Sequence, residues 1–157
     1  MGSPRTMHRF AALLLAVVLT GAGIHAQQRR DLSLDEAMGG HTLARHVGKS
    51  DAELAERLGR ERQISAASTY TDRATAERSV GAALAGGGGK LASWIRRSGR
   101  RPNLVLRYVE SSHQPIGRSL RRGRARTVPC TRAIVVLRWD DRKDRYYVLT
   151  SYPEADR

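Results

Sequence analysis

Two histidines and two cationic side chains lie together in residues 40–49. Histidine has an ordinary pKa of about 6.5, so it is the side chain best suited to accept and release a proton near neutral pH. His46 precedes Arg57 by eleven residues, close to three turns of a helix, although Gly48 interrupts the path. The spacing leaves open whether the imidazole and the guanidinium meet, and whether His46 or His41 is the base.

Two hydroxyl side chains near the end of the sequence could complete such a site. Thr150 and Tyr152 are two residues apart in a run rich in β-branched and aromatic residues, which predicts a strand. Side chains two apart in a strand project from the same face, and strict alternation would place Tyr146 and Val148 on that face too. A pair of hydroxyl side chains is also common in sheets without any catalytic role, so a role in catalysis would require other reactive groups opposite this face.

Other groups are candidates for binding a substrate rather than reacting with it. These candidates are His41, Lys49, Ser68, Thr71 and Arg118. Ser68 and Thr71 belong to a hydroxyl-rich run that offers hydrogen-bond donors, or equally the capping and turn interactions found before a helix. Arg118 opens a basic stretch, residues 117–126, which we interpret as a loop whose guanidinium groups suit phosphate oxygens.

The charge of the chain favours an anionic partner. There are 28 Lys and Arg against 15 Asp and Glu, a formal net charge of +13. Such a field attracts polyanions, nucleic acid above all, although an Arg-rich composition also fits a genome bias. There is no Cys/His cluster at zinc spacing and no acidic EF-hand-like loop, so we expect neither a metal ion nor a cofactor.

The first 26 residues have the three parts of a secretory signal. Arg5 and Arg9 precede an apolar run, and small residues lead to a cleavage site after Ala26. The run has about ten residues, short of the roughly 20 that span a bilayer, although a membrane anchor is the alternative. We therefore expect a secreted or periplasmic protein with no membrane span after cleavage. The single Cys130 excludes an internal disulfide.

Helices are expected first and strands later. Capping boxes at Ser33–Glu36 and Ser50–Glu53, and the pair Thr71-Asp72, predict helix starts, and four glycines at 86–89 predict a flexible loop. Strands are predicted over 104–109, 133–139 and 146–152, the last two joined by a polar turn. This order is typical of an α+β domain with an antiparallel sheet. We expect a signal peptide over 1–26, a short tether with a helical turn over 27–38, and one domain over 39–157.

Four separated motifs carry a more specific signal. They are His41-Thr42-x-x-Arg45-His46-Val47-Gly48-Lys49-Ser50, the run Ile64–Asp72, the pair Gly117-Arg118, and Thr150-Ser151-Tyr152-Pro153. In this order they resemble the bacterial RNase A-like toxin domain, known from the C-terminal tips of contact-dependent growth inhibition toxins. The resemblance spans about residues 39–155 and is more specific than any one motif.

The resemblance implies a kidney-shaped α+β fold like pancreatic ribonuclease but without disulfides, with N-terminal helices packed on a curved antiparallel sheet. It also implies metal-independent cleavage of RNA and a cognate immunity protein as a possible partner. Matched by motif, His46 is the catalytic histidine, Arg57 the catalytic arginine, and Thr150 and Tyr152 the paired residues of the last strand. The last strand contains no histidine, unlike pancreatic-type enzymes, so the general acid is open.

The leading hypothesis is an exported, monomeric endoribonuclease, a toxin or effector. It would cleave RNA by attack of the 2′-OH, leaving a 2′,3′-cyclic phosphate. The alternative is a non-catalytic basic protein of the cell envelope that binds nucleic acid or another polyanion. A third hypothesis is an unrelated secreted α+β module whose charge reflects its genome.

Overall fold

Two antiparallel sheets of three strands form the frame of the protein, in a computed structural model that describes residues 29–155. The predicted signal peptide, 1–26, lies outside the described residues. The helices are α1 (Leu32–Ala37), α2 (Thr42–His46), α3 (Asp51–Arg60), α4 (Arg73–Gly86) and α5 (Gly88–Ile95). The strands are β1 (Ala66–Tyr70), β2 (Leu104–Val109), β3 (Gly117–Arg121), β4 (Val128–Cys130), β5 (Arg132–Asp140) and β6 (Arg145–Glu154). The predicted α+β class with antiparallel strands is confirmed.

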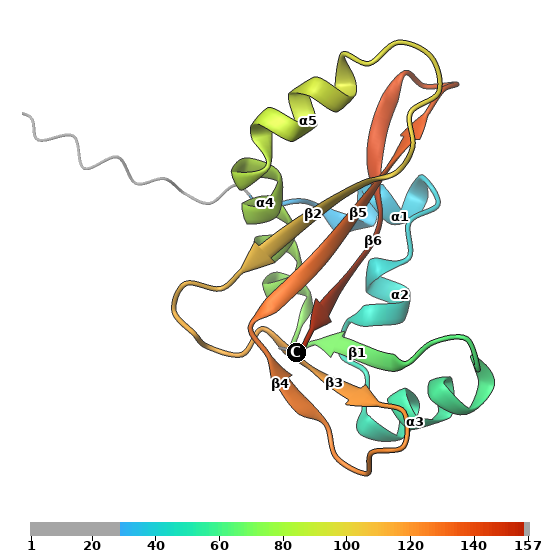
Figure 1. Cartoon of the computed structure of the whole chain (residues 1–157), viewed down its shortest axis with the longest axis vertical. Coiled ribbons are helices and arrows are strands. Elements are labelled where there is room, and N and C mark those ends of the chain that lie inside the picture. The colour runs from blue at the N-terminus through green and yellow to red at the C-terminus, as the bar shows by residue number, and fades with distance from the viewer. Residues whose placement is uncertain (1–28, 156–157) are drawn as a thin grey trace, which may run out of the picture.

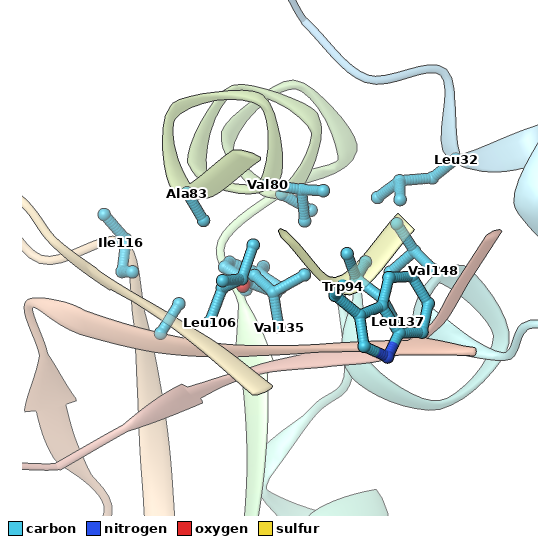
Figure 2. Packing of buried hydrophobic residues seen from close by; sticks show 12 residues of the cluster. Leu32, Val80, Ala83, Trp94, Leu106, Ile116, Val135, Leu137 and Val148 are labelled. Carbon is cyan, nitrogen blue, oxygen red and sulfur yellow. The ribbon is translucent and has the colours of Figure 1, made fainter. Parts of the chain in front are cut away.

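The two sheets have the strand orders β1-β3-β4 and β2-β5-β6, and each is covered by helices (Figure 1). Helix α4 packs on the second sheet, where Val80 and Ala83 point toward Leu106 and Val135 (Figure 2). Helix α3 packs on the first sheet, where Leu54 forms a smaller apolar cluster with the residues of β1 and β3. Cys130 is fully buried, which is common for a free cysteine that packs as a small apolar side chain.

The predicted helix starts at Ser50 and Asp72 are confirmed. Ser50 forms a full capping box with Glu53, and the Asp72 side chain accepts a hydrogen bond of 2.7 Å from the backbone of Thr75. The predicted box at Ser33 is wrong. Asp31 caps α1 instead, because its carboxylate accepts from the Ser33 N–H at 2.9 Å and places Ser33 inside the first turn.

The glycine run is helical on both sides of Gly87 rather than a flexible loop. Helix α5 begins at Gly88, and only Gly87 separates it from α4. A Cβ on Gly87 would lie 2.8 Å from the Leu106 side chain, so glycine here permits close packing of the helix junction on β2.

The hydroxyl-rich run and the start of the basic stretch are strands, which the sequence analysis missed. Residues 66–70 pair with 117–121 as β1 and β3, with Ser68 opposite Ser119. The expected loop at 117–126 is therefore a strand followed by a turn. Serine, glycine and arginine are poor strand signals by themselves, and the pairing between distant segments overrides their local preference.

A bulge in β6 changes which side chains share a face. Val136 pairs with Thr150 and Leu137 pairs with Val148, so Leu149 is an extra residue. Because Val136 and Leu137 face opposite sides of the sheet, Thr150 and Val148 do too. The expectation of one shared face is thus wrong, and Val148 is fully buried in the core.

The edge of β6 that carries the bulge is bound by α1, α2 and the segment between them. The Val148 N–H donates to the Asp35 carboxylate at 2.9 Å, and the His41 N–H donates to the Leu149 carbonyl at 3.0 Å. The Ser151 N–H donates to the Thr42 hydroxyl at 2.8 Å. These three contacts therefore satisfy backbone N–H and carbonyl groups that an unpaired strand edge would leave without hydrogen bonds.

We expect Gly40→Ala to destabilise the protein by about 1–3 kcal/mol. A Cβ at this position would lie 2.5 Å from the Val148 carbonyl oxygen and 2.9 Å from that of Asp35, which are backbone atoms that cannot rotate away. The control is Gly59→Ala in α3, where a Cβ meets nothing within 4 Å and should stabilise by about 0.5–1 kcal/mol. Urea unfolding measures both changes, and equal effects would contradict the close contact.

Candidate active site

A pocket of about 710 Å³ lies between the two sheets. Its walls come from α2, α3, the segment after α3, β1, β3 and the end of β6. The lining residues are His41, His46, Arg57, Gln63, Ile64, Ser65, Ala66, Ser68, Ser119, Arg121, Thr150, Tyr152, Pro153, Glu154 and Ala155. The four residues predicted to carry chemistry, His46, Arg57, Thr150 and Tyr152, are thus brought together.

His46 is the last residue of α2, and its side chain is held by β1. The ring Nδ1 lies 3.1 Å from the Ser68 carbonyl oxygen, and only 6 % of the residue is exposed. The next two residues extend this attachment, since Val47 forms a parallel bridge with Tyr70 and the Gly48 N–H donates to the Tyr70 carbonyl at 3.2 Å. The imidazole is therefore fixed in orientation by the backbone of the strand.

The environment keeps the His46 imidazole neutral. Burial is the main cause that lowers its pKa to about 4, and the nearby Arg57, His41 and Arg45 lower it further, against the hydrogen bond to Ser68. When the ring is neutral, an Nδ1–H that donates to the Ser68 carbonyl leaves Nε2 without a proton. Such an Nε2 is a proton acceptor.

Arg57 lies on α3, one turn before the C-terminus of the helix. Its guanidinium pairs with Glu61 four residues on, with a shortest distance of 3.3 Å, and 16 % of the side chain is exposed. Its Nη1 is buried and has no hydrogen-bond partner among the residues that the structure describes. A buried donor without an acceptor costs about 1–3 kcal/mol, so this nitrogen is a position at which an anion would be stabilised.

Thr150 and Tyr152 enter the pocket from β6, beyond the bulge. The Tyr152 and His46 ring centroids are 5.5 Å apart. Burial raises the pKa of Tyr152, so the phenol keeps its proton at neutral pH. The Thr150 hydroxyl is buried and, within residues 29–155, without a hydrogen-bond partner. The strand thus supplies two hydroxyl groups beside the imidazole.

His41 also lines the pocket, at the start of α2. Its ring centroid is 6.5 Å from that of His46, and burial together with Arg45 lowers its pKa. It is less buried than His46 and has no side-chain hydrogen bond that caps the helix. Both histidines of the motif are therefore neutral groups of one pocket, and His46 is the one that the backbone orients.

Of the other residues predicted to bind substrate, Ser68 lines the pocket, whereas Lys49, Thr71 and Arg118 do not. The Arg118 guanidinium donates to Asp51 at 2.6 Å and to the Lys49 carbonyl at 2.7 Å. The Lys49 ammonium lies 3.7 Å from Glu53. Arg118 therefore links β3 to the start of α3, and this link helps to position α3 without contributing a side chain to the pocket.

Several pocket residues were not singled out from the sequence. Gln63, Ser119, Arg121 and Glu154 belong to the walls. Arg121 lies in the basic stretch, so charge pointed to its segment, but nothing in the sequence distinguishes it from Arg118. Among the described residues no three His, Cys, Asp or Glu side chains are grouped as metal ligands would be. Nor does any helix within 29–155 have the length and apolarity needed to cross a membrane.

The sequence matches the family model described as the bacterial CdiA-CT RNAse A domain, over residues 40–153. The chain belongs to this family. A crystal structure of a CdiA-CT/CdiI complex from Y. kristensenii 33638 is similar, with 33% identity and a TM-score of 0.64, covering 73% of this chain and 99% of that one. No curated protein matches the chain.

Membership in the CdiA-CT RNAse A family confirms the resemblance seen in the four motifs. The fold is α+β and RNase A-like, with one cysteine and no disulfide. The family supports ribonuclease activity and a role as a toxin domain. The match begins at Gly40, immediately before the histidines, and ends at Pro153, immediately after the paired hydroxyl residues, so it contains the four candidate catalytic residues.

We expect the protein to lose stability as the pH falls from 6.5 to 4. The folded pKa of His46, about 4, is below the unfolded value of about 6.5, so only the unfolded chain takes up this proton in that window. The loss should approach about 3 kcal/mol at 1.36 kcal/mol per pKa unit. Unfolding free energies at both pH values measure it. His46→Gln should reduce the dependence to the smaller share of His41, whose pKa is lowered as well, and an unchanged slope in that variant would show that His46 is not the group that titrates.

Proposed function

We propose that the protein is an endoribonuclease that cleaves RNA by attack of a ribose 2′-OH on the adjacent phosphorus. The observation that carries this proposal is one pocket with a neutral, oriented imidazole, a buried guanidinium nitrogen and a buried hydroxyl, and neither of the last two has a hydrogen-bond partner among residues 29–155. A base and two phosphate-binding donors are what this reaction requires.

The first step is removal of the 2′-OH proton. His46 accepts it at Nε2, and the positive charge that forms on the ring is stabilised by the Ser68 carbonyl at Nδ1. The 2′ oxygen then forms a bond to phosphorus while the bond from phosphorus to the 5′ oxygen breaks. His41 is the alternative base, because it lines the same pocket at a ring distance of 6.5 Å.

Charge grows on the phosphoryl oxygens during this exchange. Arg57 supplies a cation whose Nη1 has no hydrogen-bond partner in the described part of the chain, so the phosphate can become its acceptor. The Thr150 hydroxyl can donate to the same group after rotation of its side chain. Removal of one such preorganised donor typically lowers kcat by about 10²–10³-fold.

The leaving 5′ oxygen requires a proton. Tyr152 is protonated at neutral pH because burial raises its pKa, and its ring lies 5.5 Å from that of His46. We infer that its phenol donates to the phosphate or to the leaving oxygen. The products are a 2′,3′-cyclic phosphate and a free 5′-hydroxyl, and DNA is spared because it lacks the nucleophile.

We further propose that residues 1–26 direct export, so that the monomeric domain meets RNA outside the cytoplasm of its producer. The similar structure is a CdiA-CT/CdiI complex, which supports a cognate immunity protein as a partner here too. In this proposal, export itself protects the producer from its own ribonuclease. An immunity gene that proved essential to the producer while export was intact would contradict that protective role. Fractionation of cells producing the full chain tests the location.

Purified protein should cleave RNA in the presence of EDTA, leave DNA intact, and produce 2′,3′-cyclic ends. His46→Ala should abolish cleavage because the 2′-OH then has no base. His113→Ala is the matched control, since His113 is exposed and does not line the pocket. Gel assays and mass spectrometry of the ends are the measurements. Binding of RNA without any cleavage would favour the alternative, a basic binding protein.

The pH profile of kcat/KM should show an acidic limb near pH 4 rather than near 6.5. This ratio reports the free enzyme, in which burial lowers the pKa of His46 to about 4. Initial rates on a dinucleotide at constant ionic strength give the profile. If His46 is the base, His41→Asn should keep the activity and raise the limb only slightly, because burial and not His41 is the main cause of the low pKa of His46. Loss of the activity and of the limb in that variant would assign the role to His41.

A further inference from the structure

The arginines of the segment from β3 to β4 fall into two groups. Arg118 is bound to Asp51 and to the Lys49 carbonyl, as described above. Arg122 donates to the carbonyls of Leu58, Glu61 and Ile64 at 2.8–3.2 Å, which fixes the end of α3 to the β3–β4 turn. Both guanidinium groups therefore make hydrogen bonds within the protein that connect β3 and its turn to α3.

The remaining arginines of the segment line a second hollow. Its volume is about 710 Å³, and its walls are Ser119, Arg121, Arg124, Ala125, Arg126, Val128, Pro129 and Ala155. Ser119, Arg121 and Ala155 line the active-site pocket as well. The two hollows therefore adjoin, and together they form a groove that runs from His46 to the β3–β4 turn.

Arg124 and Arg126 are the cations at the far end of this groove. Both are exposed, and in the part of the chain that the structure describes neither forms an ion pair with an acidic side chain. Among residues 29–155, no acidic side chain lines the second hollow. Arginine forks match the geometry of phosphate oxygens, so this end of the groove suits a phosphodiester backbone.

We propose that the second hollow binds the backbone of single-stranded RNA next to the cleaved phosphate, with Arg124 and Arg126 as its phosphate contacts. The proposal rests on the proposed function, since it extends the same pocket. It names a longer single strand, rather than a dinucleotide or a duplex, as the preferred substrate. Arg121, shared by both hollows, lies between the reacting phosphate and this flank.

The depth of the site explains the preference for a single strand. His46 is 6 % exposed at the wall of a pocket between two sheets, so the reacting ribose must enter the pocket. An A-form duplex is stiff and contacts proteins mainly through its shallow minor groove, whereas a single strand can bend into one hollow and continue into the next. Because phosphate contacts carry no sequence information, we expect this part of the groove to bind RNA of any base sequence.

A binding experiment tests the groove without any cleavage. The probe is a 2′-O-methyl oligoribonucleotide of about ten nucleotides, a length within the usual site sizes for single strands, which lacks the nucleophilic 2′-OH. Fluorescence anisotropy across a salt series should show that Arg124→Gln with Arg126→Gln reduces the steepness of log K against log salt by about 1.4, at about 0.7 for each phosphate contact.

The matched control removes the same charge elsewhere. Arg97 and Arg100 are exposed and belong to the segment between α5 and β2. Figure 1 shows this segment at the end of the molecule opposite the β3–β4 turn. Arg97→Gln with Arg100→Gln should leave the salt slope unchanged. An equal loss of slope in both double variants would mean that net charge alone attracts RNA, and the groove proposal would be overturned. Failure of wild-type protein to bind the probe, or equal binding of a duplex, would overturn it too.

Cleavage assays separate this proposal from the proposed function. Arg124→Gln with Arg126→Gln should raise KM severalfold for an unmodified single strand of about ten nucleotides and leave dinucleotide cleavage unchanged. A parallel loss on the dinucleotide would place these arginines in the reaction itself and contradict a flanking role. If wild-type protein cleaves neither RNA, the proposed function fails, while the anisotropy result still decides whether the groove binds.

Discussion

The bulged edge of β6 is bound by two short helices, α1 and α2, and the segment between them, and the position of the active site depends on this contact. Asp35, His41 and Thr42 each make one hydrogen bond to the backbone of β6, on both sides of the extra residue Leu149. The same contact places α2 against the strand that carries Thr150 and Tyr152. Gly40 lets the two backbones approach closely enough for these bonds to form.

Helix α2 is attached at its other end to β1, through the bridge of Val47 to Tyr70 and the contact of His46 with Ser68. A five-residue helix therefore spans the gap between the two sheets, and the pocket is the space that it leaves. The Tyr70 hydroxyl lies 2.6 Å from that of Ser151 and links the sheets a second time. The protein holds these parts together with polar contacts and a core, in place of disulfides.

Local signals were enough to predict the capping of α3 and α4, the β5–β6 hairpin and the α+β class. The motifs also predicted the four residues that meet in the pocket. What could not be predicted depends on pairing between distant segments. Ser68 becomes part of a strand by pairing with β3, where Ser119 lies opposite it, and the bulge at Leu149 lies on the edge that α1 and α2 bind. Without the bulge, alternation would have placed Val148 beside Thr150.

Charge by itself was the least informative signal about the site. The basic stretch contains five arginines, and the fold assigns them to different tasks according to which side of β3 and its turn each occupies. Arg118 and Arg122 satisfy a carboxylate and helix-end carbonyls, which stabilises the position of α3 and thus of Arg57. A guanidinium whose donors are taken up by the protein has few left for a phosphate. Of the five arginines, Arg124 and Arg126 are therefore the ones that we assign to a polyanion, because neither forms an ion pair with an acidic side chain within residues 29–155.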